Sequence, residues 1–168
     1  MSKLGNDTLT ETRNHLLNEI NLLSDDQFNW IANRDSWSIA QVCHHLVLVE
    51  EATIKAISWG LKAGDFTQTE YINVERLILD RTKKRIAPKI VEPSLESIPV
   101  KRIKALLNES RNKLLTLLST VEDKSILTKK SMKHPALGEI TLNQWVDQIY
   151  FHEQRHIEQI KEIKALFE

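Results

Sequence analysis

The chain has 168 residues, the length of a single domain, and we expect one domain over residues 1–168. Hydrophobic residues make up 41% of it and charged residues 27%, a balance typical of a globular protein with one core. The 23 basic and 23 acidic side chains give a formal net charge of zero, which argues against a protein that mainly neutralises nucleic-acid phosphates. The single cysteine, Cys43, excludes an internal disulfide and favours a reducing compartment.

No segment suggests a secretory signal or a membrane span. The N-terminal residues lack the apolar core of a signal peptide. No stretch approaches the roughly 18 uninterrupted apolar residues that a spanning helix needs. We therefore expect a cytoplasmic protein with neither a nucleic-acid nor a membrane partner.

Apolar residues recur every three or four positions through most of the chain, which is the spacing of one face of an α-helix. Ser38 and Thr141 each begin a sequence of capping-box form, with Gln41 and Gln144 three residues later. We expect four long helices, at about residues 8–23, 38–59, 100–121 and 141–167.

The second predicted helix is followed by the longest connection. Gly60 and Gly64 mark the expected end of that helix. Residues 69–86 suggest a further helical stretch with a basic end at residues 81–85. Three prolines in residues 88–99 then predict an extended segment, because proline does not continue a helix.

The other connections are short. Residues 24–27 have the pattern of a helix cap followed by a turn of helix, and residues 33–36 and 134–138 are typical of loops. No pair of segments indicates a β-sheet. Four long helices joined by short loops and one long crossover predict an all-α fold, a four-helix bundle with a long crossover connection.

Two histidines of the last predicted helix are candidates for a functional site. His152 and His156 are four residues apart, so both imidazoles lie on one face of the helix. Ile149 precedes the pair by three positions and Ile160 follows it by four. The pair therefore belongs to the apolar stripe and is expected to face the core.

His45 is a third inward-facing candidate, three residues after Val42 and four before Val49 in the second helix. A buried imidazole without a partner is costly, and a shared metal ion supplies partners for all three rings. Three nitrogen ligands with open coordination positions are typical of a catalytic metal site. We expect His45, His152 and His156 to bind a divalent metal ion. The alternative, that they are hydrogen-bonded core histidines, is left open by spacing alone.

Neighbouring polar residues have expected roles of their own. Gln148 and Gln159 share the face of the histidine pair and are candidates to orient the ligand rings. Glu153 and Arg155 are expected to face solvent or to pair between helices. The basic run at residues 81–85 is consistent with contact to an anionic group, but a cationic helix C-terminus is the preferred interpretation.

The remaining histidines and the cysteine are expected to be structural. His44 is rotated about 100° from His45 around the helix, which places it at the surface or at an interface. Cys43 is expected to be a small buried apolar residue. His15 is expected to be partly exposed, and His134 either fixes its loop or lines the mouth of a pocket.

Three segments resemble the DinB-like family. Residues 37–46, WSIAQVCHHL, are similar to the WSIxxVxxHL start of the family's second helix. Residues 134–141, HPALGEIT, resemble the HPxLGxxT sequence before its last helix, and residues 151–160, FHEQRHIEQI, resemble the HxxRHxxQI sequence within it. The order and separation of the three segments also match, and the likeness covers nearly the whole chain.

The resemblance implies a four-helix bundle, often a homodimer, with zinc or nickel held by three histidines. These fall on His45, His152 and His156; His45 is chosen over His44 because the family's histidine directly precedes a leucine, here Leu46. Characterised relatives include transferases of low-molecular-weight thiols such as bacillithiol, and a mycothiol-dependent isomerase. Other relatives are described as metal-dependent hydrolases. The family's substrate pocket varies, so the resemblance implies no substrate-contacting residue.

A metal-dependent enzyme acting on a small-molecule substrate is the leading functional prediction. A divalent ion on three neutral imidazoles lowers the pKa of a bound water or thiol, which allows hydrolysis of a small substrate or transfer of a thiol to a small electrophile. We find no Ser-His-Asp set, glycine-rich phosphate loop or pair of inward carboxylates, and the lack of an inward general base favours thiol transfer. Two alternatives are a non-catalytic stress-response protein that binds a metal or small ligand, and a structural dimer.

Overall fold

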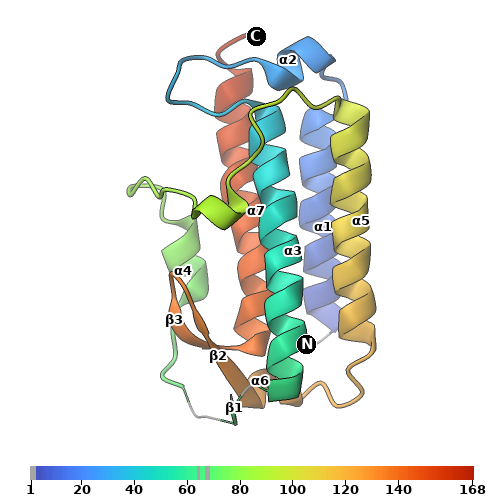
Figure 1. Cartoon of the computed structure of the whole chain (residues 1–168), viewed down its shortest axis with the longest axis vertical. Coiled ribbons are helices and arrows are strands. Elements are labelled where there is room, and N and C mark those ends of the chain that lie inside the picture. Colours follow the sequence, from blue (N-terminus) through green and yellow to red (C-terminus); the bar gives the residue numbers. More distant parts are fainter. Residues whose placement is uncertain (1–2, 64, 67–68) are drawn as a thin grey trace.

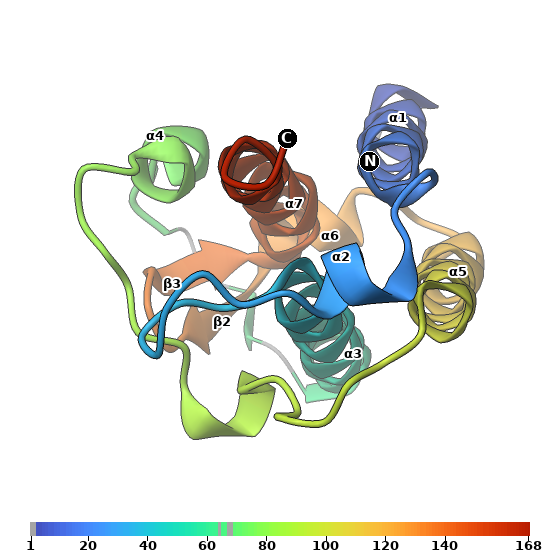
Figure 2. The same ribbon diagram turned by 90° about the horizontal axis from the view of Figure 1, so that it is seen from above.

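The structure is a computed structural model that describes residues 3–63, 65–66 and 69–168. Four long helices lie side by side in a bundle, which confirms the predicted fold (Figure 1). They are α1 (Lys3–Ile20), α3 (Ile39–Ala63), α5 (Val100–Ser119) and α7 (Leu142–Lys164). α3 and α5 run in the same direction, opposite to α1 and α7, because a long crossover returns the chain along the bundle between α3 and α5 (Figures 1 and 2).

Capping boxes begin the two helices that carry the candidate histidines. Before α3, the Ser38 hydroxyl accepts a hydrogen bond from the Gln41 backbone N–H at 3.1 Å, and the Gln41 side chain accepts from the Ser38 N–H at 3.0 Å. Thr141 and Gln144 make the same reciprocal pair before α7, at 3.2 and 3.3 Å. Both predicted helix starts are confirmed.

α3 continues to Ala63, so Gly60 lies inside the helix and the end predicted near residue 59 is four residues too early. Gly60 is buried, and a Cβ atom there would collide with the side chains of Met132 and Leu142. Its role is therefore the close packing of α3 against neighbouring elements. Gly64 is outside the described residues.

The predicted helical stretch at residues 69–86 is much shorter in the structure. Only α4 (Val74–Leu79) is helical, with the Asn73 side chain accepting from the Arg76 N–H at 2.9 Å. The basic run follows this helix instead of ending it. The proline-rich connection is extended as predicted, apart from one turn of 3₁₀ helix, η1 (Lys89–Val91).

A small antiparallel sheet contradicts the prediction that no strands pair. Its order is β1-β2-β3, and the β2–β3 hairpin pairs His134 with Gly138 and Ser131 with Thr141. Gly138 has a φ of +80°, a conformation that glycine adopts without strain. The strands are β1 (Asp65–Phe66), β2 (Lys130–His134) and β3 (Gly138–Thr141). Two further short helices are α2 (Asp25–Asn29) and α6 (Ile126–Lys129), and α2 confirms the turn of helix expected near residues 24–27.

A layer of buried charges crosses the bundle between two apolar clusters. Each long helix contributes one residue to this charged layer: Arg13 from α1, Glu50 from α3, Arg111 from α5 and Glu153 from α7. Each guanidinium contacts both carboxylates, at N–O distances from 2.6 to 3.0 Å. Burial alone raises the pKa of Glu50, but the two arginines hold it below its ordinary value. The prediction of no paired inward carboxylates is therefore wrong.

The charged layer separates the two apolar clusters of the core. Along each long helix, the apolar residues before the charged residue belong to one cluster and those after it belong to the other. In α7, Ile149 belongs to the apolar cluster on one side of Glu153 and Ile157 to the cluster on the other. Leu114 and Leu107 flank Arg111 of α5 in the same way. Among the described residues no helix is long and apolar enough to cross a membrane.

Candidate metal centre

The three predicted ligands meet between α3 and α7. His45 comes from the first half of α3, and His152 and His156 come from successive turns of α7. Nε2 of His152 lies 3.3 Å from Nε2 of His45 and 3.0 Å from Nε2 of His156. One nitrogen from each ring lies within 4.8 Å of the other two. His45 and His156 are buried and His152 is half-buried.

The outer nitrogens of two of these rings are held by hydrogen bonds. Nδ1 of His45 lies 2.7 Å from the Val91 carbonyl oxygen, which only accepts hydrogen bonds, so Nδ1 carries the proton. Nδ1 of His156 lies 2.7 Å from the amide oxygen of Gln159, so the same holds for His156. In both rings the bare Nε2 lone pair therefore points into the cluster.

Hydrogen bonds among the three rings cannot satisfy all three Nε2 atoms. Nε2 of His152 faces two bare Nε2 atoms, and a single N–H there donates to one of them only. A divalent cation accepts all three lone pairs at once. Tetrahedral zinc with Zn–N bonds of about 2.0–2.1 Å separates its ligand nitrogens by roughly 3.3–3.4 Å. The two short Nε2–Nε2 distances are close to this value, so the donor set fits a zinc-sized ion.

Electrostatics keep the imidazoles neutral, as ligation requires. Burial lowers the pKa of His45 below its ordinary value, although the hydrogen bond to Val91 raises it. Burial and the neighbouring His45 lower the pKa of His156 to about 3. Burial and the two other rings also lower the pKa of His152. The lone pairs are therefore available at neutral pH.

The flanking polar residues of α7 divide into three roles. Gln159 orients a ligand ring, as predicted, but the Gln148 amide donates instead to the Thr53 hydroxyl at 3.0 Å. Glu153 forms the interhelical pairs of the charged layer. Arg155 donates to backbone carbonyl oxygens in the last turn of α4 and just after it, including that of Asp80 at 2.6 Å.

The other candidate side chains have structural contacts. The Cys43 thiol is fully buried, and burial raises its pKa, so it is not a ready nucleophile. Nδ1 of His44 accepts from the Ser94 N–H at 3.0 Å. Nδ1 of His134 accepts from the N–H groups of Ala136 and Leu137 at 3.1 and 3.2 Å, which fixes the hairpin turn.

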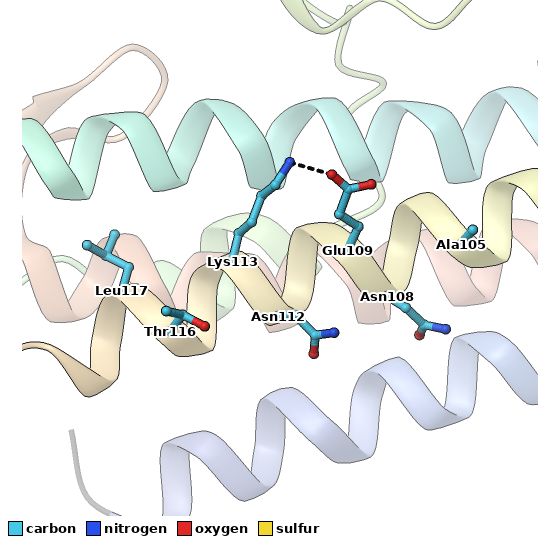
Figure 3. Close-up of a pocket in the computed structure, with 7 residues that line it drawn as sticks. All are labelled: Ala105, Asn108, Glu109, Asn112, Lys113, Thr116 and Leu117. Atoms are coloured by element: carbon cyan, nitrogen blue, oxygen red, sulfur yellow. Dashed lines mark ion pairs between the residues drawn. The ribbon is translucent and has the colours of Figure 1, made fainter.

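Two surface hollows lie away from the three histidines. One, of about 680 Å³, follows α5, where Lys113 and Glu109 form an ion pair of 2.8 Å (Figure 3). The other, of about 420 Å³, lies between the segment before α4 and the first half of α7 and includes Asp147 and Tyr150. Neither hollow is lined by a histidine of the cluster.

Comparison with known proteins assigns the family. Residues 8–160 match the family model of the DinB superfamily. The chain belongs to the DinB superfamily. It is 31% identical over 158 residues to the uncharacterized protein YuaE of Bacillus subtilis (strain 168), covering 94% of this chain and 96% of YuaE.

Solved structures share the DinB-like fold. YfiT from Bacillus subtilis, described as a probable metal-dependent hydrolase with an unusual four-helix bundle topology, aligns with a TM-score of 0.67 and 21% identity over 99% of this chain and 90% of that one. TT2238, described as a four-helix bundle protein, aligns with a TM-score of 0.64 and 17% identity over 96% and 99% of the two chains. A conserved protein from Enterococcus faecalis aligns with a TM-score of 0.63 at 11% identity, over 98% of each chain.

Proposed function

We propose that this DinB-superfamily chain is a metal-dependent enzyme acting on a small molecule, with His45, His152 and His156 as ligands of a zinc or nickel ion. The convergence of three Nε2 atoms, two with their protons fixed on the opposite nitrogen, carries the proposal. The description of YfiT as a probable metal-dependent hydrolase supports it. The homodimer implied by the family resemblance stays a prediction, which size measurement in solution would check.

When bound, such an ion would act as a Lewis acid and lower the pKa of a water or thiol in its coordination sphere. The histidines orient the ion, and because they are neutral they leave its double positive charge undiminished. The half-buried side chain of Trp37 packs against the ring of His45, with ring centroids 5.1 Å apart, and covers one side of that ligand.

Thiol transfer is the reaction that we favour. Glu50 and Glu153 are the buried carboxylates among the described residues, and both are bound by arginines. Neither is therefore available as a general base for water. A thiol such as bacillithiol depends less than water on a general base to remove its proton, because a thiol ionises nearer to neutral pH. Hydrolysis of a small ester or amide is the second candidate, favoured by the description of YfiT.

Metal analysis and activity assays test the proposal together. Wild-type protein incubated with zinc or nickel and then desalted should retain about one ion per chain, and His45→Ala, His152→Ala and His156→Ala should each lose most of it. His15→Ala, which removes an exposed imidazole, is the matched control and should retain the ion. Loaded protein should then form metal-dependent adducts from bacillithiol or glutathione and a generic electrophile.

The outcomes separate the functional alternatives. Protein that takes up no zinc or nickel contradicts the metal site and leaves hydrogen-bonded core histidines. Protein that binds the ion but forms no adduct and hydrolyses no ester across such a panel contradicts the enzyme. That result would favour a protein that only binds a metal or a small ligand.

A further inference from the structure

The segment that runs from the end of α4 through η1 lies outside the four long helices (Figures 1 and 2). We call residues 80–91 the crossover arm. At its first residue, the Asp80 carbonyl accepts from Arg155 of α7 at 2.6 Å. At its last residue, the Val91 carbonyl lies 2.7 Å from Nδ1 of His45. Since Arg155 is next to a cluster histidine in α7, both ends of the arm are attached beside the three-histidine cluster.

The crossover arm carries an excess of positive charge. Its only acidic residue is Asp80, whose carboxylate accepts hydrogen bonds from Thr82. Arg81 is neutralised by Glu162 through two hydrogen bonds of 2.6 and 2.7 Å. The cationic residues of the arm are Arg81, Lys83, Lys84, Arg85 and Lys89. The crossover arm therefore brings a net positive charge to the neighbourhood of the cluster.

Among the described residues, Arg85 and Arg155 make hydrogen bonds to backbone oxygens and no ion pair. Burial and the neighbouring Arg85 and Arg81 lower the pKa of Arg155, and the Asp80 carboxylate offsets this only in part. Arg85 donates Nη2 to the Leu77 carbonyl at 2.8 Å, and Arg155 donates to carbonyl oxygens only, that of Lys83 among them. In the part of the chain that the structure describes, neither guanidinium forms an ion pair. An arginine has five N–H donors, so one bond from Arg85 leaves four for another acceptor. Two guanidiniums without an ion pair favour a negatively charged acceptor.

Both guanidiniums lie at the end of α4 that faces the cluster histidines of α7. Arg85 donates to the Leu77 carbonyl and Arg155 to the adjacent Ile78 carbonyl, and Arg155 directly precedes His156. Arg85 and Arg155 each contribute to lowering the pKa of His152, after the larger effects of burial and the other rings. Arg85 also contributes, after burial, to lowering the pKa of His134 to about 4. Because Nδ1 of His134 accepts two backbone N–H groups, Nε2 of this neutral ring carries its proton and is a further donor near Arg85.

We propose that Arg85 and Arg155 form an anion-binding subsite beside the three-histidine cluster, which takes a carboxylate or phosphate group of the reacting molecule. This inference rests on the proposed function, because it names the charge of the molecule that meets the metal. The basic run thus has a binding role, and Arg155 also positions the start of the crossover arm through its hydrogen bonds to the Asp80 and Lys83 carbonyls.

Small thiols on cobalt-loaded protein test the subsite. The thiol sulfur reports on the metal through a sulfur-to-cobalt absorption band, and its other end reports on the arginines. We expect 3-mercaptopropionate or 2-mercaptoethyl phosphate to bind about tenfold more tightly than neutral 3-mercaptopropionamide at constant ionic strength. The anion that binds more tightly indicates whether the subsite takes a carboxylate or a phosphate group. Arg85→Gln should remove most of the preference.

Lys84→Gln is the matched control, since it removes the same charge from the neighbouring exposed residue, and it should keep the preference. Equal binding of the acid and the amide by the wild type would overturn the subsite, as would equal losses in the two variants. Cobalt that is not retained contradicts the proposed function instead. In that case NMR of the arginine Nε–H groups in metal-free protein decides: shifts at Arg85 and Arg155 with 3-mercaptopropionate but not with the amide support the subsite, and their absence overturns it.

Discussion

The amide oxygen of Gln159 lies 2.7 Å from Nδ1 of His156, one turn earlier in α7, and so fixes which nitrogen of that ring faces the other two histidines. Without this acceptor the ring is free to take the other tautomer or to rotate. Such hydrogen bonds typically account for 10- to 100-fold in metal affinity.

Gln159→Leu should therefore weaken zinc binding by about 10- to 100-fold, measured by competition with a chromophoric chelator. Gln154→Leu is the control, because Gln154 is also half-buried in α7 and has no hydrogen bond among the described residues. Equal affinities for the two variants would show that Gln159 does not orient His156.

The charged layer predicts a large stability difference between two glutamates of one helix. Glu153→Gln replaces the buried carboxylate that faces Arg13 and Arg111 by a neutral amide. Because the two guanidiniums then share only one negative charge, we expect the free energy of unfolding to fall by about 3–5 kcal/mol. Glu158→Gln breaks only an exposed pair with Lys161 and should change it by less than about 1 kcal/mol. Urea denaturation of metal-free protein measures both. A loss below about 1 kcal/mol for Glu153→Gln would contradict the importance of the layer.

The lowered histidine pKa values predict an acid-sensitive metal-free state. An unfolded histidine titrates near pH 6.5, whereas in the folded protein the pKa of His156 is about 3. Between these values the unfolded chain binds more protons, so stability is lost as the pH falls below about 6.5, by up to about 1.4 kcal/mol per pH unit for each such histidine. His156→Gln should show a shallower loss between pH 6.5 and pH 4 in urea denaturation. Parallel curves for wild type and variant would refute this.

The close packing at Gly60 predicts that α3 tolerates no larger side chain at this position. Gly60→Val places a branched side chain against Met132 and Leu142, and we expect a loss of about 1–3 kcal/mol in unfolding free energy. Ser58→Val, a half-buried neighbour in the same helix, should change it by only about 0.5 kcal/mol. Thermal or urea denaturation checks the pair, and equal stabilities would show that the contact can relax.

The helices and the histidine cluster could be predicted from the sequence because both depend on local spacing. Capping boxes located the starts of α3 and α7, and three- and four-residue steps placed the three histidines on inward faces. The small sheet was missed because its strands are short and β2 carries two lysines, which hide the alternation of a half-buried strand.

The charged layer was missed for a different reason. Glu153 is four residues after Ile149 and four before Ile157, so it interrupts an apolar stripe and its burial could have been suspected. In α3 the stripe was drawn through Val49, which is only half-buried, instead of Glu50. Which charges meet across the bundle depends on the relative height of the helices, and one sequence does not contain that information.

The same layer also constrains how the helices can be assembled. Its two positive and two negative groups lie at one level, one from each long helix, and every guanidinium contacts both carboxylates. A helix that slid by one turn, about 5.4 Å, would still present apolar residues to its neighbours but would leave a charge buried without its partners. The charges thus penalise misaligned bundles that hydrophobic packing alone tolerates, and they keep α3 and α7 at the heights that bring His45 opposite His152 and His156.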